Sequence, residues 1–266
     1  MSRLETRFAA LAASGRKALT TFITAGDPSL DATVPALHQL VASGADIIEL
    51  GIPFSDPEAE GPAIQASSER GLANGTRLVT CLDMVKTFRE QDTETPVVLM
   101  GYLNSVLAMG EETFAAAAAE AGVDGLIMVN LPPEEADTLK AALDRANIDL
   151  IFLVAPTTTD ERLPKILARA SGFVYYVSLK GITGADHLDA AAVGERVAKI
   201  KARTHLPVQV GFGIKDGTAA RAIGRHADGV VVGSALVRTM GGEADAARRL
   251  ARLAEQAAEL RQALDG

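Results

Sequence analysis

Short apolar runs alternate along the chain with longer stretches in which apolar residues recur at the three- and four-residue spacing of an amphipathic helix. The runs are nearly all apolar, which is typical of parallel strands that are covered on both faces. Glycine, proline or aspartate interrupts the chain around many of them. We predict strands at 19–25, 47–49, 96–100, 125–129, 150–154, 173–177, 207–210 and 229–232.

Helical patterns occupy the segments around these strands. They lie at 2–14, 30–43, 78–90, 111–121, 133–146, 159–170, 189–203, 217–225 and 243–264. The last carries a stripe of leucine and alanine that is typical of a packed outer helix. Eight alternations of strand and helix favour a closed (β/α)8 barrel over an open doubly wound sheet. We therefore predict a single α/β TIM-barrel domain over residues 1–266, with an extra N-terminal helix.

A small residue, an aspartate and an apolar run occur together at three places in the chain. These segments are 44–48, 122–127 and 227–231. Each has the pattern of a helix end that leads into a buried strand. The recurrence indicates repeated β/α units.

Composition narrows the class of protein further. Of the 266 residues, 48% are hydrophobic and 23% charged, so the chain can bury a large core. The net charge of −8 argues against nucleic acid or an anionic membrane as the main partner, although backbone N–H groups can still bind a phosphate. The sequence has a single cysteine, Cys81, and shows neither a leader nor an apolar run of membrane-spanning length, so we expect a cytoplasmic protein. The four histidines are scattered, and we predict no metal site.

The segment from Glu49 to Pro62 is a long and constrained loop. Its glycines and prolines prevent a continuous strand or an immediate helix, and it contains four carboxylates. Glu49 ends the second strand and Glu60 lies beyond the turn, so a chain that folds back brings both to one cavity. Paired carboxylates in different environments commonly separate an acid from a base. The alternative for this stretch alone is a solvated acidic loop.

In a barrel of this kind the active site lies at the carboxyl ends of the strands. Glu49, Phe22 and Tyr102 lie at or near such ends. Tyr175, within the sixth strand, is either an ordinary core tyrosine or a ligand contact. Glycine-containing loops follow strands six, seven and eight, at 178–185, 211–214 and 233–235. The last two are the usual phosphate site of this fold, so the residues indicate carboxylate acid/base chemistry on a phosphate-bearing substrate.

The run from Glu49 to Pro57, followed by Gly61-Pro62 and Ile64-Gln65, closely resembles the signature of the tryptophan synthase alpha chain family. The resemblance extends over essentially the whole chain. Further matching segments are Phe22 with 26–28, 101–104, 181–184, 211–214 and 233–234. The resemblance implies retro-aldol cleavage of indole-3-glycerol phosphate to indole and glyceraldehyde 3-phosphate, with no cofactor in this chain. It also implies an α2β2 complex in which a beta chain that carries pyridoxal phosphate (PLP) receives the indole.

The resemblance further implies a role for each site residue. Glu49 is expected to transfer the proton, and Glu60 to accept the indole N1–H and stabilise the positive charge that develops on the ring. Thr183 is expected to orient Glu60. The indole pocket is expected to be lined by Phe22, Met100, Tyr102, Tyr175 and Phe212. Backbone N–H groups for the phosphate are expected at Gly184, Gly213, Gly233 and Ser234. The surface that faces the partner chain is expected at Pro53, Asp56, Pro57 and Asn104.

Three positions depart from the family pattern. The family usually has Leu-Ala-Asp where this chain has Glu58-Ala59-Glu60, and it usually has Asp where Asn130 stands. Glu60 keeps the charge but adds a methylene, and a positional error of ~1 Å can reduce a rate ~100-fold. Glu58 adds a second negative charge, which is expected to raise the pKa of Glu60. Asn130 cannot act as a charged partner.

These departures leave other interpretations open. In one, a catalytically weakened alpha-like subunit mainly binds and activates a PLP-dependent beta chain. In another, the chain is a lyase that releases indole without any partner. Other phosphate-binding barrels share the loops after strands seven and eight but not the loop from Glu49 to Pro62.

Overall fold

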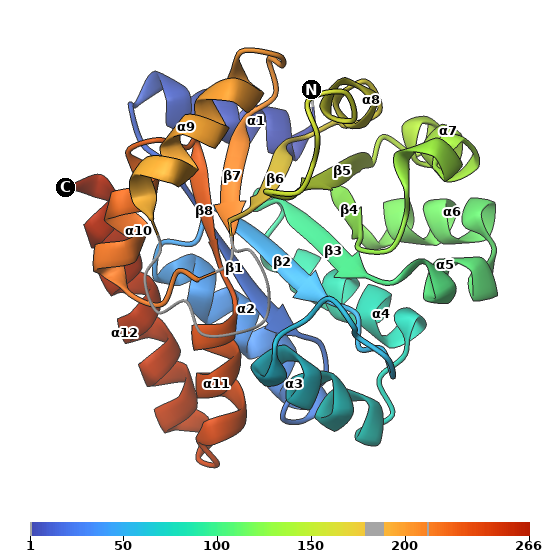
Figure 1. The fold of residues 1–266 in the computed structure, drawn as a ribbon. Helices are drawn as coiled ribbons and strands as arrows, with labels where there is room; N and C mark the ends of the chain where they lie inside the picture. The colour runs from blue at the N-terminus through green and yellow to red at the C-terminus, as the bar shows by residue number, and fades with distance from the viewer. Residues whose placement is uncertain (1, 179–188, 212) are drawn as a thin grey trace.

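The computed structural model describes residues 2–178, 189–211 and 213–266, which form a closed barrel of parallel strands (Figure 1). The strands are β1 (Ala18–Thr24), β2 (Ile47–Gly51), β3 (Val97–Gly101), β4 (Gly125–Met128), β5 (Asp149–Val154), β6 (Val174–Val177), β7 (Val208–Gly211) and β8 (Gly229–Val232). Each strand pairs with the next one along the chain, and β8 closes the ring on β1. The predicted TIM barrel is confirmed, with strand ends that differ by at most two residues from the predicted ones.

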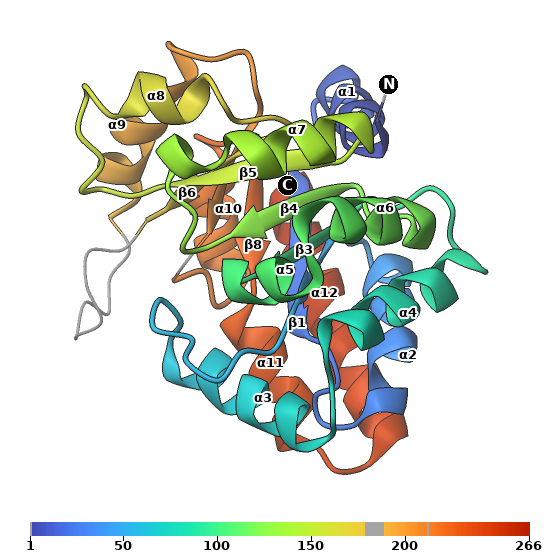
Figure 2. The same cartoon turned by 90° about the vertical axis from the view of Figure 1, so that its right-hand side faces the viewer.

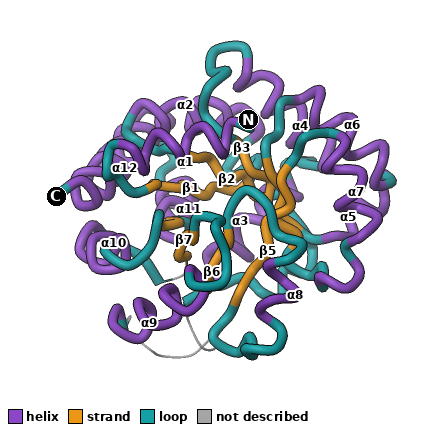
Figure 3. The backbone as a smooth tube through the Cα atoms, turned by 90° about the horizontal axis from the view of Figure 1, so that it is seen from above, coloured by secondary structure: helices purple, strands orange, loops and turns teal. Residues whose placement is uncertain are grey.

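Helices form an outer layer around the strands, as the view from above shows (Figure 3). They are α1 (Arg3–Ala13), α2 (Thr33–Ala42), α3 (Pro62–Ala73), α4 (Leu78–Arg89), α5 (Leu103–Met109), α6 (Glu111–Ala121), α7 (Asp137–Arg145), α8 (Leu163–Leu167), α9 (Ala190–Lys201), α10 (Gly217–Gly224), α11 (Ser234–Gly242) and α12 (Ala246–Asp265). Two short 3-10 helices, Leu30–Ala32 and Pro133–Glu135, precede α2 and α7. Within the described residues, none of the helices combines the length and the apolar character that a bilayer crossing requires.

Three helices, α3, α5 and α11, have no counterpart among the predicted ones. The buried positions of α3 are Ser67, Ser68 and Gly71, so this helix shows no apolar stripe in the sequence. The other two have only seven and nine residues, too few to establish a helical period. The helix predicted at 159–170 is only the five-residue α8, which begins just before Pro164, as is common because proline favours the first turn.

Side chains alternate along each strand between the barrel interior and the helical layer. In β2, Ile48 and Leu50 pack in the large cluster between strands and helices, whereas Ile47 belongs to the smaller cluster inside the barrel. Glu49 is two residues after Ile47 and therefore faces the interior. The strand period thus directs a carboxylate into an otherwise largely apolar barrel.

Helix α1 covers the amino-terminal end of the barrel. It begins with a capping box, in which the Ser2 hydroxyl accepts the N–H of Glu5 at 3.2 Å and the Ser2 N–H donates to the Glu5 carboxylate at 2.8 Å. Its apolar face, formed by Leu4, Phe8 and Leu11, packs into the interior cluster. This helix closes one end of the barrel and leaves the carboxyl ends of the strands for the site.

The aspartates of the recurring sequence motif join neighbouring strands at this closed end. Each carboxylate accepts the backbone N–H of a residue at the start of the preceding strand. These bonds run from Leu19 to Asp46, from Val97 to Asp124 and from Val208 to Asp228, at 2.8–2.9 Å. Each carboxylate also pairs with a cation from a helix. These cations are Arg261, Arg89 and Lys201 respectively. The motif therefore marks positions that fix the start of one strand against the next.

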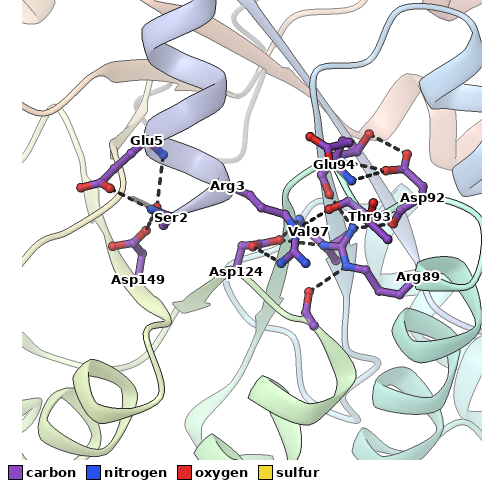
Figure 4. A network of polar contacts seen from close by, with 12 residues as sticks. Ser2, Arg3, Glu5, Arg89, Asp92, Thr93, Glu94, Val97, Asp124 and Asp149 are labelled. Carbon is purple, nitrogen blue, oxygen red and sulfur yellow. Dashed lines mark hydrogen bonds and ion pairs between the residues drawn. The ribbon is translucent and has the colours of Figure 1, made fainter.

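Asp124 has the most partners of the three aspartates (Figure 4). Its Oδ1 accepts from Nη1 of Arg3 at 2.9 Å, and its Oδ2 accepts from Nη2 of Arg89 at 2.7 Å. The side chains of Asp124 and Arg89 are only 5% and 10% exposed. Arg89 also donates to the carbonyl of Thr95 at 2.7 Å. The network therefore depends on a buried ion pair, and removing one partner leaves the other charge desolvated.

We expect Asp124→Ala to lower the free energy of unfolding by about 3–5 kcal/mol, because it leaves the Arg89 guanidinium buried without its carboxylate. Urea unfolding measures the change. Glu120→Ala is the matched control, because Glu120 pairs with Lys86 at the surface, where the side chains are 75% and 61% exposed. The control should lose less than about 1 kcal/mol. Equal losses in the two variants would show that the Asp124 network contributes no more than a surface pair.

Candidate active site

A cavity of about 210 Å³ opens at the carboxyl ends of the strands. Its wall is formed by Phe22, Glu49, Glu60, Ile64, Met100, Tyr175, Gly213, Ile214, Lys215, Val231, Gly233, Ser234 and Arg238. Helices α3 and α11, which follow β2 and β8, lie side by side (Figure 2), and each contributes residues to the cavity wall. The fold thus brings eight of the sequence-predicted site residues to one place: Phe22, Glu49, Glu60, Met100, Tyr175, Gly213, Gly233 and Ser234.

Glu49 is the buried carboxylate of this cavity. It is paired in register with Phe22 on β1 and Val98 on β3, and it is 1% exposed. Its Oε2 has no hydrogen-bond partner among the described residues. Burial, together with the nearby charge of Glu60, raises the pKa of Glu49 to about 8. The side chain therefore holds its proton at neutral pH, which suits a general acid.

Glu60 is the second carboxylate and stands at the end of the loop before α3. Its N–H donates to the carbonyl of Pro57 at 3.0 Å, and its carbonyl accepts from Nε2 of Gln65 at 2.9 Å. The residue is 8% exposed, and burial raises its pKa to about 7. The expectation that Glu58 raises this pKa is wrong: Glu58 is exposed, and burial causes the shift.

Tyr102 contacts the loop that carries Glu60 and is not part of the cavity wall among the described residues. Its hydroxyl accepts the N–H of Ala59 at 3.0 Å. Its ring stacks on Phe54, with 4.8 Å between the ring centroids and 15° between the planes. Ala59 directly precedes Glu60, so Tyr102 fixes the backbone that positions this carboxylate. The sequence predicted Tyr102 as a lining residue of the indole pocket, whereas the structure places it against the loop that carries Glu60.

Tyr175 forms part of the cavity wall from within β6. The buried site and the two carboxylates, Glu49 and Glu60, raise its pKa well above the ordinary value, so the phenol stays neutral. Its hydroxyl lies against Gly211, where an added Cβ would be only 2.1 Å from the oxygen. Gly211 therefore makes room for this ring at the end of β7. As a wall residue, Tyr175 can contact a ligand in the cavity.

The loops after β7 and β8 supply the glycine-rich side of the cavity. Gly213 has a φ of +79°, a left-handed conformation that favours glycine. Gly233 is the N-cap of α11, and no side chain caps this helix. Because the first N–H groups of a helix have no partner within the helix, the start of α11 at Ser234 provides free donors and a positive dipole end. This arrangement suits a phosphate group.

Other expected residues either are outside the described residues or do not belong to the described cavity wall. Thr183, Gly184 and Phe212 are outside the described residues. Pro53 is buried against α3, where a Cβ added to Gly71 would lie 2.9 Å from its ring. Asp56 is exposed and accepts a hydrogen bond from the Ser55 hydroxyl at 2.5 Å, and Pro57 is half-buried.

Asn130 and Asn104 form a polar contact at the start of α5. The Asn130 amide oxygen accepts the N–H of Leu103 at 2.8 Å, and its Nδ2 donates to Asn104 at 3.2 Å. Both asparagines are exposed. Asn130 thus satisfies one of the free donors of α5, a role that needs an oxygen acceptor but no charge.

The sequence interpretation missed some of the cavity residues. These are Ile64, Ile214, Lys215, Val231 and Arg238. Lys215 follows Gly213 by two residues, and Arg238 follows Ser234 by four, one helical turn. Their proximity to the glycine loops was therefore a usable signal in the sequence.

The fold and the cavity define a class of protein: a barrel enzyme with a buried carboxylate pair beside a glycine-rich anion site. A family model described as the tryptophan synthase alpha chain matches residues 8–265. Curated tryptophan synthase alpha chains from Thioalkalivibrio sulfidiphilus and Burkholderia pseudomallei are 57% and 55% identical over 100% of this chain, and over 100% and 98% of their own lengths. The chain belongs to the tryptophan synthase alpha chain family.

Solved structures agree with this assignment. Tryptophan synthase subunit alpha from Legionella pneumophila has a TM-score of 0.92 at 44% identity, covering 100% of this chain and 99% of that one. A chain of tryptophan synthase from M. tuberculosis, in its aminoacrylate-bound form, has a TM-score of 0.89 at 38% identity, covering 99% and 100%. The chain is therefore a carbon–carbon lyase of tryptophan biosynthesis that cleaves indole-3-glycerol phosphate, and the interpretation as a weakened subunit is not supported. Membership of the family implies a beta-chain partner.

The raised pKa of Glu49 makes stability depend on pH. The folded chain keeps this proton up to about pH 8, whereas the unfolded chain loses it near the ordinary value of 4.5. Between these values the folded state binds more protons, so the free energy of unfolding falls as pH rises. Glu49→Gln removes this titration, and we expect its stability relative to the wild type to be about 3–4 kcal/mol greater at pH 8 than at pH 5. Urea unfolding at both pH values measures the difference; identical pH dependence would contradict the raised pKa.

Proposed function

We propose that Glu49 and Glu60 together carry out the retro-aldol cleavage of indole-3-glycerol phosphate, Glu49 as the proton carrier and Glu60 as a charged stabiliser. The observation that carries this proposal is the convergence of both buried carboxylates with the glycine loops at Gly213 and Gly233 in one cavity. A phosphate held at the glycine loops directs the rest of the substrate toward the carboxylates. The cavity thus offers the substrate an anion site and an acid/base pair together.

The first step is proton transfer to the ring. Because the pKa of Glu49 is raised to about 8, its side chain is protonated at neutral pH and can donate to C3 of the indole. Protonation makes C3 tetrahedral and places a positive charge on the ring nitrogen. The bond between C3 and the side chain can then break, because its electron pair can return to the ring.

The second step returns the proton to Glu49. The newly formed carboxylate takes the proton of the adjacent side-chain hydroxyl, an oxygen electron pair forms the aldehyde carbonyl, and the carbon–carbon bond breaks toward C3. Indole regains its aromatic system, and glyceraldehyde 3-phosphate is the other product. Glu49 ends the cycle protonated, as it began, so one residue accounts for both proton transfers.

Glu60 supplies the opposite charge. A negative charge on Glu60 raises the pKa of Glu49 and so helps to keep the proton there. An ionised Glu60 can accept the indole N1–H and stabilise the positive charge that protonation creates. Tyr102 holds the loop in place for this contact. Two carboxylates in one cavity thereby take different roles.

The remaining cavity residues bind the two ends of the substrate. Phe22, Met100 and Tyr175 provide an apolar wall for the indole. Gly213, Gly233 and Ser234 provide the phosphate site. Thr183, Gly184 and Phe212, which lie outside the described residues, are assigned the roles that the family resemblance implies. We assign the whole of residues 1–266 to one domain.

We further propose that the chain works in the cytoplasm as the alpha subunit of an α2β2 complex. The PLP is expected in the beta chain, and this chain needs no cofactor, because its own carboxylates supply the proton transfers. The proposed contact with the beta chain is a surface formed by four residues. Asp56, Asn104 and Leu107 are exposed, and Pro57 is half-buried. Leu107 is 57% exposed, which supports this contact, because burying an apolar side chain against a partner is favourable. Pro53, which the sequence placed at this contact, is buried against α3 and is not part of the proposed surface.

Glu49→Gln should reduce kcat for indole release by at least about 100-fold, because glutamine has the shape of the acid but cannot transfer its proton. Affinity for inorganic phosphate, measured by calorimetry, should stay within about twofold of the wild type, a change of about 0.4 kcal/mol. The assay follows indole release from indole-3-glycerol phosphate with and without the beta chain. A loss of phosphate affinity with kcat preserved would assign Glu49 to binding.

Glu60→Asp should preserve or raise kcat, since it restores the side chain usual in the family. Glu60→Gln should lower kcat by about 10–1000-fold, because a neutral amide cannot compensate the charge on the ring. Steady-state indole release under saturating substrate compares the two variants. A large loss in Glu60→Asp would instead show that this barrel is adapted to the longer glutamate.

A further inference from the structure

Two cations line the cavity without any partner in the part of the chain that the structure describes. Lys215 and Arg238 both belong to the cavity wall, and both side chains are exposed. Most arginines of the described residues are held by a carboxylate or a carbonyl, but no ion pair or side-chain hydrogen bond within residues 2–178, 189–211 and 213–266 involves either of these two. Their charges are therefore available to a ligand.

The positions of the two cations match the anion site. Lys215 lies between Gly213 and the start of α10 at Gly217. Arg238 lies on α11, one turn after Ser234, and residues four apart are neighbours on one helix face. The two therefore come from the same two loops that supply the free backbone donors. Both side chains line the same cavity as Gly233 and Ser234 at the start of α11.

The charge balance of the cavity favours a role for such cations in phosphate binding. The carboxylates of the cavity wall are Glu49 and Glu60. The chain as a whole has a net charge of −8. A phosphate dianion brought into this site is repelled by an ionised Glu60 and by the overall charge. Backbone N–H groups donate hydrogen bonds but carry no net charge. Lys215 and Arg238 are the cations of the cavity wall in the described residues, and they offset this repulsion.

We propose that Lys215 and Arg238 bind the substrate phosphate directly, as charged ligands that complete the glycine site. Arg238 offers a planar fork that suits two phosphate oxygens, and Lys215 offers a compact point charge. This inference rests on the proposed function, because it assigns the cavity a phosphorylated substrate. According to this inference, affinity for the phosphate depends on the side chains of Lys215 and Arg238. The proton transfers depend on the carboxylates.

The test uses Lys215→Met, Arg238→Gln and the double variant, which keep much of each side chain's length but remove its charge. Each single variant should weaken inorganic phosphate binding and raise KM for indole-3-glycerol phosphate about tenfold. The kcat in the complex with the beta chain should stay within about twofold. The affinity for indole, which has no phosphate, should not change. Calorimetry and steady-state kinetics supply these values.

The matched controls are Lys199→Met and Arg225→Gln, which remove the same charges from exposed positions outside this cavity. They should leave phosphate affinity and KM near the wild-type values. Equal weakening in the controls would mean that net charge alone acts, and would overturn the proposal. Unchanged phosphate affinity in the double variant would assign the binding to backbone donors alone and overturn it as well. If the wild type released no indole, the proposed function would fail, while the phosphate titrations would still decide the role of the two cations.

Discussion

The closure of eight parallel strands into one ring is the constraint on which the rest of the structure depends. Because every strand runs in the same direction, the loops that follow β2, β7 and β8 meet at one end of the barrel. Glu60 and Gly213 are far apart in the sequence but share one cavity for this reason. At the other end, aspartates fix the start of one strand against its neighbour, and α1 fills the opening.

Buried carboxylates have opposite electrostatic environments at the two ends of the barrel. At the closed end Asp124 is buried with two arginines and a backbone N–H as partners, so its charge is compensated. At the open end Glu49 is equally buried, but its Oε2 has no partner among the described residues and its pKa rises to about 8. The first arrangement adds stability, whereas the second reduces it to keep a proton ready for transfer. The same residue chemistry thus serves structure at one end and catalysis at the other.

The sequence by itself determined the barrel, its strands and the main site residues. Apolar runs are local properties, so they predicted the strands and placed Glu49 at the end of the second one. The family signature around Glu49 to Pro62 predicted the reaction. Helices α3, α5 and α11 were missed because α5 and α11 are short and α3 buries serine and glycine in place of an apolar stripe.

Only the tertiary structure decided how strongly the carboxylates are perturbed and what surrounds them. The pKa of Glu60 is raised by burial and not by its sequence neighbour Glu58, because desolvation depends on atoms from distant strands and loops. Tyr102 proved to hold the Glu60 loop, a contact across 43 positions of the chain. Lys215 and Arg238 also reach the cavity wall only because the barrel brings the loops after β7 and β8 together. Local patterns specify elements and their faces, whereas burial, charge balance and loop contacts arise only when the elements are packed together.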